Sequence, residues 1–457
     1  MPASAADAPA PAEEAPPLAG SAPAKADTAL GKVTVTARRR EEDSQKVPTP
    51  ITVLGGETLE AQRISRVQDL QQVLPSVNVA YIHARQSSVA VRGIGNNPAS
   101  DGLEGSAGIY LDNVYLGRPG MAVFDLLDIE QLELLRGPQG TLFGKNTTAG
   151  VLNISTRAPT FTTERTVEVS GGQDGYFQGR GTVSGPLGET LAGRLSAYRT
   201  RDDGYIKNIH DDNYLNGGER QGARGQLLFE PNEDFSLRWI ADYNEEDSSN
   251  GSMVVYGAAE RFWQRAALVG ASPLRDPQRK KVNINGRQHV SVHQGGSSLE
   301  ANWNLAGGYR LTSISAYRYW HFTPANDEQL NVSAINDTGV EVHDRQFSQE
   351  IRLASPTGGA FDYVVGAYAF RQNLGNKTFT SYGPLADLYL LGANLGALND
   401  TYSKANGKIE TDSFALFAQG TWHLSERLDF TAGLRGTYEE KNAKVERFAP
   451  LGGAAVG

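Results

Sequence analysis

The 457-residue chain contains no cysteine, so disulfides, cysteine-ligated zinc sites and thiol catalysis are excluded together. It also lacks any run approaching the ~18 continuous apolar residues of a membrane-spanning helix. A β-barrel is not excluded, because barrel strands alternate between two faces and are only half apolar. A basic excess is missing as well, since the formal net charge is -9. The short run Arg38, Arg39, Arg40 is therefore interpreted as a solvated charge cluster, and nucleic acid is not expected as a partner.

The N-terminal region shows no folding pattern. Residues 1–31 are rich in Ala and Pro, which predicts a disordered linker. No signal peptide is visible, because the region has acidic residues but no apolar core. We expect that the chain is either a mature form or begins downstream of the true start. Residues 33–37 then form a short β-branched run, which suits strand addition to a partner's sheet edge or an ordinary short strand.

Residues 41–160 carry a mixed pattern that predicts a compact α+β domain with Gly-rich connections. Ser65 followed by Gln68 forms a capping-box pattern at the start of a helix that Pro75 closes. Apolar residues at helical or alternating spacing predict the other elements. The expected strands cover 51–54, 77–80, 88–92 and 108–116, the expected helices cover 57–64, 65–74 and about 121–127, and an apolar run covers 129–135.

Residues 161–457 have β character throughout. For example, Phe347 and Ile351 alternate with Ser348 and Glu350. Such runs are about ten residues long, which is enough to cross a bilayer at a tilt. A sandwich would turn the charged face to bulk water, whereas a transmembrane barrel would turn the apolar face to lipid and the polar face to a wet lumen.

The connections favour the barrel. Short turns are expected at 185–189, 230–234, 306–308, 355–360 and 423–426, and long loops at 200–221, 244–297, 321–344 and 372–410. Short and long connections thus alternate along the chain. Outer-membrane barrels have this asymmetry, with short periplasmic turns and long extracellular loops.

Residues 130–154, which read EQLELLRGPQGTLFGKNTTAGVLNI, resemble the end of the plug domain of TonB-dependent outer-membrane receptors. Residues 91–95 and 108–115 resemble two further plug motifs in the expected order, and residues 349–353 and 430–435 resemble parts of the barrel. The resemblance defines a plug structural motif, in which the glycines are expected to supply backbone freedom. Its members are Arg136, Gly137, Pro138, Gly140, Gly144, Asn146 and Gly150.

The resemblance also places residues 32–40 where the family keeps its TonB box. It implies that this segment is disordered or loosely held and pairs with TonB as an added strand. The residues expected to bind TonB are Val33, Thr34, Val35, Thr36 and Ala37.

The implied fold is an α+β plug domain followed by an antiparallel transmembrane β-barrel. The implied function is import of a scarce ligand, most often a ferric siderophore, across the outer membrane with energy delivered through TonB. The expected partners are TonB, the ligand and outer-membrane lipid, and no enzyme activity, cofactor or metal site is expected. A signalling receptor, or an importer of cobalamin, haem or plant-derived carbohydrates or aromatic compounds, remains an alternative. The ligand-contacting residues are unknown at this stage.

The barrel is expected to be incomplete. Residues 161–457 supply about eleven strands, whereas the large plugged class has about 22. A strand ending in a terminal aromatic residue is also missing. We therefore expect an N-terminal fragment whose open sheet partly wraps the plug and leaves its first and last strands unpaired. Such a sheet cannot form a closed pore alone, because unpaired backbone groups are costly in hydrocarbon.

Two patterns suggest binding chemistry but carry weak signals. The glycines at 140–144 resemble a phosphate loop, yet their spacing is one residue short and Asn146 stands where Ser or Thr should hold magnesium. His289 and His293 could share a helix face and ligate a metal, but they fall in an expected long loop and are interpreted as solvated. Asp211 and Asp212 are interpreted in the same way.

An aromatic group near a strand end has two interpretations. Tyr317, Tyr319 and Trp320 suit the interfacial girdle of a barrel, and this is the favoured interpretation. A position facing the ligand in the outer vestibule is the alternative.

Overall fold

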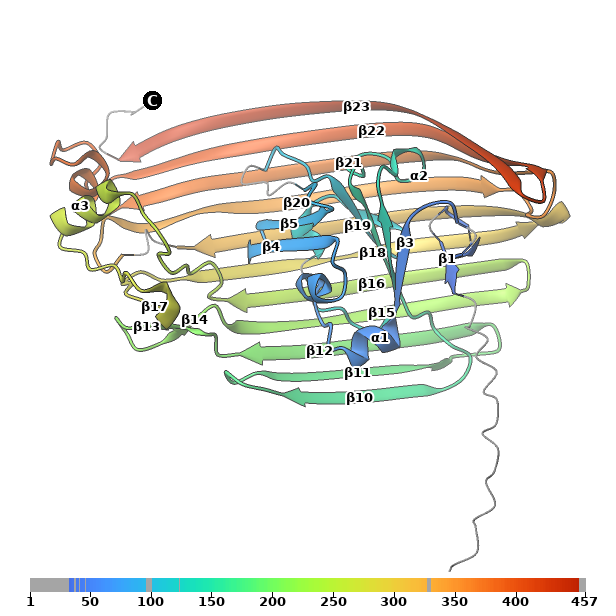
Figure 1. Ribbon diagram of the computed structural model, residues 1–457, viewed down its shortest axis with the longest axis horizontal. Helices are drawn as coiled ribbons and strands as arrows, with labels where there is room; N and C mark the ends of the chain where they lie inside the picture. Colours follow the sequence, from blue (N-terminus) through green and yellow to red (C-terminus); the bar gives the residue numbers. More distant parts are fainter. Residues whose placement is uncertain are drawn as a thin grey trace, which may run out of the picture.

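The computed structural model describes residues 33–36, 38–40, 42–45, 47–95, 101–122, 124–326 and 330–451. The linker expected at 1–31 and Ala37 of the expected TonB box lie outside the described residues. Figure 1 shows a small set of elements near the N-terminus lying against one face of a large sheet. We call the described residues from 47 to 156 the plug, and the large sheet the wall.

The plug is built on a five-stranded sheet in the order β3-β8-β9-β6-β7. β6 and β9 run parallel, and the other neighbours are antiparallel. The strands are β3 (Ile51–Gly55), β8 (Ile129–Arg136), β9 (Gly150–Thr156), β6 (Ala107–Leu111) and β7 (Val114–Leu116), and a separate hairpin joins β4 (Val77–His83) to β5 (Gln86–Val91). The helical turns are α1 (Gly56–Ala61), η1 (Val67–Gln72), η2 (Pro119–Ala122) and α2 (Gly140–Phe143).

The local structure of the plug corrects three expectations. The helix after Ser65 is capped through Asp69 rather than Gln68, because the Asp69 carboxylate accepts hydrogen bonds from the backbone N–H groups of Ser65 and Arg66. The single strand expected at 108–116 is a hairpin, since Asp112 and Asn113 both adopt positive φ and form a tight turn. The helix expected at about 121–127 is limited to the short turn η2.

The plug core continues into the wall. Leu70, Leu132 and Ile154 of the plug are fully buried in one apolar cluster. Trp320 and Phe322 of the wall belong to the same cluster, with stacked rings 5.7 Å apart. The plug therefore packs on the wall as a continuation of its own core and is not a separate body resting beside it.

The wall is an eleven-stranded antiparallel sheet in which each strand pairs with the next one along the chain, apart from the short loop strands. Within the described residues, β10 and β23 each pair on one side only, so the sheet stays open as expected. In order, the strands are β10 (Glu164–Gly171), β11 (Phe177–Pro186), β12 (Leu191–Asp202), β15 (Gly218–Asn232), β16 (Phe235–Ser248), β18 (His289–Leu305), β19 (Tyr309–Ala325), β20 (Ile335–Ala354), β21 (Phe361–Tyr382), β22 (Tyr402–Ser425) and β23 (Leu428–Leu451).

The alternation expected from the sequence is present on these strands. On β20, Phe347 and Ile351 face away from the plug and are exposed, whereas Ser348 and Glu350 face the plug and are buried. On these residues the outer face of the wall is apolar and the inner face polar, but the inner face also carries apolar residues such as Trp320 and Phe322 that join the plug core.

Short and long connections alternate from residue 187 onward, as predicted. The short turns are 187–190, 233–234, 306–308, 355–360 and 426–427, and the long loops are 203–217, 249–288, 326–334 and 383–401. We call the two ends of the sheet the short-turn end and the long-loop end. The strands nevertheless exceed the expected length of about ten residues, because β22 and β23 each reach 24 residues.

The long loops carry small elements of their own. A three-stranded sheet in the order β14-β13-β17 links two loops. Among the described residues, no helix has the length and apolar character needed to cross a membrane. The elements in the long loops are β13 (Ile206–Asn208), β14 (Tyr214–Leu215), β17 (Lys281–Val282), α3 (Glu260–Leu268), η3 (Pro277–Arg279) and η5 (Asp387–Leu391), whereas η4 (Ala306–Gly308) forms one of the short turns.

Candidate functional site: the boundary between plug and wall

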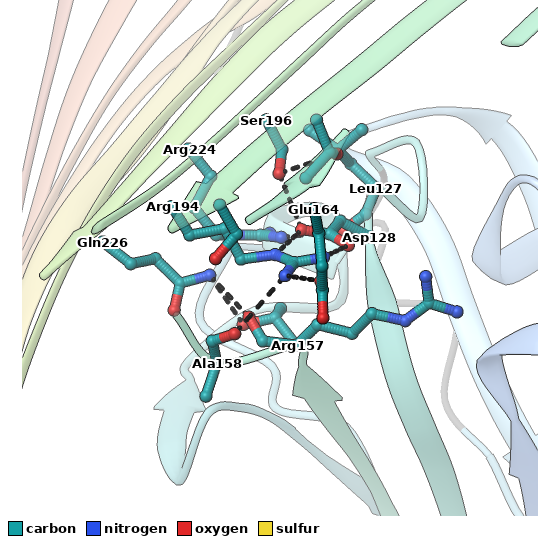
Figure 2. Close-up of polar contacts among 12 residues, drawn as sticks. Leu127, Asp128, Arg157, Ala158, Glu164, Arg194, Ser196, Arg224 and Gln226 are labelled. Atoms are coloured by element: carbon teal, nitrogen blue, oxygen red, sulfur yellow. Dashed lines mark hydrogen bonds and ion pairs between the residues drawn. The ribbon is translucent and has the colours of Figure 1, made fainter. Parts of the chain in front are cut away.

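The densest polar contact between plug and wall centres on Asp128. This residue adopts a positive φ just before β8, which turns its carboxylate toward β12. Arg194 donates to both carboxylate oxygens at 2.5 and 2.6 Å, and the Ser196 hydroxyl donates to one of them at 2.6 Å. Figure 2 shows this network, in which Arg224 also donates to the Leu127 carbonyl.

Two further plug aspartates repeat the arrangement. Asp125 accepts from Arg220 at 3.0 Å and from the Thr200 hydroxyl at 2.7 Å. Asp112 lies 3.8 Å from Arg238. We call these three aspartate–arginine pairs the clamp; its members are Asp112, Asp125 and Asp128 of the plug and Arg194, Arg220 and Arg238 on β12, β15 and β16.

Burial makes the clamp sensitive to the loss of either partner. The side chains of Asp128 and Arg194 are each 3% exposed. Burial alone would raise the pKa of Asp128, but the hydrogen bonds from Arg194 and Ser196 outweigh it and hold that pKa below its ordinary value. The carboxylate therefore stays ionised, and removing Arg194 would leave a buried charge without a partner.

On the opposite side of the plug the charges are reversed. Arg39 lies 3.5 Å from Glu350 on β20, and Arg40 lies 3.6 Å from Asp362 on β21. Lys145, just after α2, lies 3.0 Å from Glu439 on β23. The plug and the N-terminal segment (the described residues from 33 to 45) thus present three cations to β20–β23. One pair on this side keeps the polarity of the clamp, because Glu104 of the plug lies 2.7 Å from Lys441 on β23.

The expected TonB-box segment is held in place. β1 (Thr34–Val35) pairs with β2 (Glu42–Asp43), and Val35 is completely buried against plug residues that include Phe143. The Thr36 N–H donates to Glu133 at 2.8 Å. Burial raises the pKa of Glu133 above its ordinary value, although hydrogen bonds from Thr36 and Asn153 oppose the rise. The expectation of a disordered or loosely held segment is therefore wrong for residues 33–36, while their binding to TonB stays a prediction.

A cavity of about 1380 Å³ lies at the short-turn end, between the plug and β21–β23. Arg38 and Glu42 of the N-terminal segment border it, together with Gln139 of the plug and Thr421 and Asp429 of the wall. Arg38 also donates to the Thr421 hydroxyl at 2.5 Å, so the segment spans the cavity mouth. The lining is polar and mixed in charge.

The plug structural motif is shaped by its backbone. Gly137 and Gly144 adopt φ of 88° and 79°, conformations that favour glycine, and Asn146 adopts 63°. A Cβ on Gly150 would lie 2.3 Å from the Leu135 carbonyl oxygen, so the close approach of two strands requires glycine there.

The side chains of this motif have mixed roles. Arg136 donates to Ser76 at 2.9 Å and to Thr52 at 2.6 Å, and the Asn146 amide donates to Tyr115 at 2.8 Å. Pro138 borders the large cavity. Gly140 shows neither a positive φ nor a crowded Cβ position, so the expected need for glycine at this position has no support in the structure.

The expectations for the aromatic girdle and for the histidines are corrected by the alternation of side chains along the strands and by the length of the strands. Trp320 faces the plug and is fully buried, whereas Tyr317 faces outward, so the three aromatic residues do not form one girdle. His289 and His293 lie on β18 rather than in a loop, and His293 accepts or donates a hydrogen bond with Tyr243 at 2.9 Å. Asp212 lies in a loop and pairs with Lys207 at 2.8 Å. Among the described residues, no three His, Asp or Glu side chains gather as a metal site.

Sequence reasoning missed the clamp entirely. Arg194, Ser196 and Thr200 fall on the inward face of β12, and their alternation was a usable signal for polar contact with the plug. Their partners lie 66 to 75 residues away in the chain, and a single sequence gives no indication of such pairings.

Family models match most of the chain. One described as the TonB-dependent receptor plug domain matches residues 43–151. A second, described as the TonB-dependent receptor-like β-barrel, matches residues 238–453. The two matched regions correspond to most of the plug and to the wall from β16 onward.

Curated relatives include a pesticin receptor of Yersinia enterocolitica, 25% identical over 407 residues, which cover 86% of this chain and 53% of the relative. A vitamin B12 transporter of Photobacterium profundum is 31% identical over 174 residues, or 38% of this chain and 28% of the relative. The chain thus spans about half the length of the pesticin receptors it matches.

Solved structures share the fold at low identity. The ferric yersiniabactin uptake receptor of Yersinia pestis has a TM-score of 0.74 at 19% identity, covering 88% of this chain and 58% of the other. The ferripyoverdine receptor of Pseudomonas aeruginosa has a TM-score of 0.69 at 17% identity, covering 91% and 56%.

Proposed function

Because the chain belongs to the TonB-dependent receptor family, we propose that it provides the plug and the first part of the barrel of an outer-membrane receptor. This receptor imports a ferric siderophore with energy delivered through TonB. The observation that carries the proposal is a folded plug held by buried ionic pairs and a shared apolar core against the inner face of a sheet whose outer face carries apolar residues. An importer needs such a plug, because it must keep a wide barrel closed until energy is supplied.

The outer face of the wall supports insertion in the outer membrane. On β22, Trp422, Leu416 and Phe414 face outward, and the outward residues then become charged from Asp412 onward. The apolar part therefore covers about nine residues, which is the length of a tilted strand crossing a bilayer. Exposed aromatic pairs near the short turns, such as Phe235 with Trp303 and Phe361 with Trp422, suit an interfacial girdle.

The N-terminal segment supports energy coupling. Residues 33–36 lie at the short-turn end and are tied to the plug through Glu133, so a pull on them is transmitted to the plug core. TonB would gain access by releasing β1 from β2 and pairing with the freed strand.

Substitution of Val35 tests the coupling step. Val35→Pro removes a main-chain donor and restricts φ, so we expect uptake to be lost while binding of ligand to whole cells persists. Val35→Ala is the matched control, since it keeps the backbone donor while shortening the same buried side chain. Normal uptake by the proline variant would contradict the assignment of this segment.

The ligand class is tested by growth. A strain lacking the whole gene, and the same strain carrying it on a plasmid, are compared on a panel of ferric siderophores, haem, cobalamin and plant-derived carbon sources. We expect the gene to restore growth with a ferric siderophore under iron limitation. Growth restored by cobalamin alone would favour the alternative suggested by the matching vitamin B12 transporter, and restoration by none of them would contradict an import function.

A further inference from the structure

We propose that the imported ligand passes between the plug and strands β21–β23, and that the clamp side of the plug stays in place during transport. This inference rests on the proposed import function and adds the route within the receptor. It follows from three separate features of the boundary between plug and wall.

The clamp side and the side facing β21–β23 differ in the space between plug and wall. On the clamp side, the side chains of Asp125 and Asp128 are 4% and 3% exposed, and each is held by a wall arginine and a wall hydroxyl. On the side facing β21–β23, the large cavity already separates plug and wall at the short-turn end. The Arg39–Glu350 and Arg40–Asp362 pairs are buried on the second side too, so the cavity, and not weaker contact, marks where a route can open.

A second, much smaller cavity of about 30 Å³ lies on the same side, nearer the long-loop end. Leu103 and Glu104 of the plug border it, together with Thr411 and Lys441 of the wall. The two cavities therefore lie in line along β22 and β23, one toward each end of the sheet.

α2 and its contacts with the wall fill the region between the two cavities, and Leu142 and Phe143 of α2 are buried there in one apolar cluster with Phe417 of β22. A Cβ built on Gly433 would lie 2.7 Å from the Thr141 methyl carbon, and one built on Gly144 would lie 2.7 Å from the Arg435 guanidinium. We call this contact the seal; its members are Thr141, Gly144 and Lys145 at or just after α2, and Gly433, Arg435 and Glu439 on β23. A displacement of α2 would join the cavities into one route.

The N-terminal segment contacts both α2 and the wall on the side that faces β21–β23. Arg38 contacts Thr421, Arg40 lies near Asp362, and the Arg39 guanidinium stacks 4.3 Å from the Phe143 ring of α2. Force applied at residues 33–36 therefore reaches α2 and the large cavity through direct contacts. Arg39 also donates to Asn113 at 3.2 Å, and this residue directly follows the clamp residue Asp112.

The route is tested with two engineered disulfides in the whole receptor, to which these 457 residues contribute no native cysteine. The first joins Thr141→Cys to Gly433→Cys across the seal. The second joins Asp128→Cys to Ser196→Cys across the clamp, where the native oxygens are 2.6 Å apart. Each variant is assayed for ligand binding and uptake in whole cells before and after reduction, which separates the effect of the bond from that of the substitutions. Bond formation is quantified on non-reducing gels.

We expect the seal disulfide to abolish uptake reversibly while ligand binding persists, and the clamp disulfide to leave uptake at the level of its reduced form. Loss of uptake with both bonds would overturn the proposal, since it would mean that the whole plug must leave. Loss with the clamp bond alone would place the route on the other side. Failure of the unmodified receptor to import any ligand would instead contradict the proposed function.

A second variant does not depend on a disulfide. Thr431 borders the large cavity on β23, and Thr431→Trp should fill part of the route without touching the clamp. The expected result is reduced uptake with unchanged ligand binding. Thr431→Ser, which keeps the size and polarity, is the matched control. Full uptake by the tryptophan variant would contradict a route through this cavity.

Discussion

Two ion pairs on opposite sides of the plug, Asp128–Arg194 and Lys145–Glu439, join it to the same sheet but differ in sign and in burial. On the clamp side, both members of the Asp128–Arg194 pair are 3% exposed. On the opposite side, Lys145 and Glu439 are 23% and 25% exposed and lie between two cavities. The two sides as a whole do not differ in burial, since Arg39 and Glu350 on the opposite side are 2% and 5% exposed. Burial does distinguish the Asp128–Arg194 pair from the Lys145–Glu439 pair, because a charge that cannot be rehydrated when its partner is lost costs far more than one that can.

The largest expected effect comes from the clamp. Arg194→Ala leaves Asp128 buried without its partner, so we expect a loss of about 3–5 kcal/mol in the free energy of unfolding. Denaturant unfolding of the whole receptor in lipid vesicles measures it. Arg199→Ala on the outer face of the same strand is the control, with an expected loss of about 0.2–1 kcal/mol for an exposed pair. Equal losses for the two variants would remove the basis of the comparison.

A smaller effect is expected at the backbone of the seal. Gly144 has φ 79° and ψ -143°, so Gly144→Ala should cost about 1–3 kcal/mol in strain. Gly140→Ala, four residues earlier at a position with ordinary φ, is the matched control and should be neutral or stabilising by about 0.5–1 kcal/mol. Unfolding of the two variants is compared in the same vesicles. A larger loss at Gly140 would show that the described turn geometry is wrong.

A weaker effect still is expected when Lys145 is replaced. Its two partners, Glu104 and Glu439, are both partly exposed, so Lys145→Ala should cost about 1 kcal/mol or less. The comparison with Arg194→Ala is direct, because each variant removes one cation at the boundary between plug and wall. A loss of unfolding free energy as large as that of Arg194→Ala would mean that the partly exposed pair is as costly to break as the buried one.

The smallest effect concerns the pH dependence of stability. Burial raises the pKa of Glu133, so its contribution is fully present below the ordinary value of 4.5 and is lost as the pH rises through the raised value. Glu133→Gln should therefore flatten the fall in stability over that window. In the parent the Asn153 amide donates to Glu133 at 3.3 Å, so the Glu133→Gln side chain keeps this hydrogen bond when its amide oxygen lies toward Asn153. Thermal melts at several pH values measure the slope, and a slope identical to that of the parent would contradict this account of Glu133.

The sequence predicts the wall better than the site. The strand at 347–353 follows from the alternation of apolar and polar residues, and the succession of short and long connections follows from the turn residues. Both signals are local in the sequence. Strand lengths are underestimated for a physical reason. Beyond the apolar part, the outward residues of β22 become charged, as at Asp412 and Glu410, so the contrast between faces disappears while the backbone pairing continues.

The site depends on contacts that a single sequence does not encode locally. Asp112 and Asn113 signal a tight turn through their residue types, but nothing nearby indicates that Arg238 pairs with Asp112. Trp320 was assigned to a girdle by residue type, although its position one residue after the outward-facing Tyr319 places it on the inward face. Counting odd and even positions along the strand would have corrected this assignment. The aspartate–arginine pairs, by contrast, can be identified only in the folded structure.

The difference between the two sides of the plug is tested most directly by labelling during transport. Single cysteines are placed at buried wall positions, as Ala415→Cys on β22 and Ser196→Cys at the clamp, in a chain that has no other cysteine. Cells with and without TonB are exposed to ligand, and the rate of reaction with a polar maleimide is measured for each variant. We expect ligand and TonB together to accelerate labelling of Ala415→Cys and to leave Ser196→Cys protected. Acceleration at Ser196→Cys equal to or above that at Ala415→Cys would contradict the account.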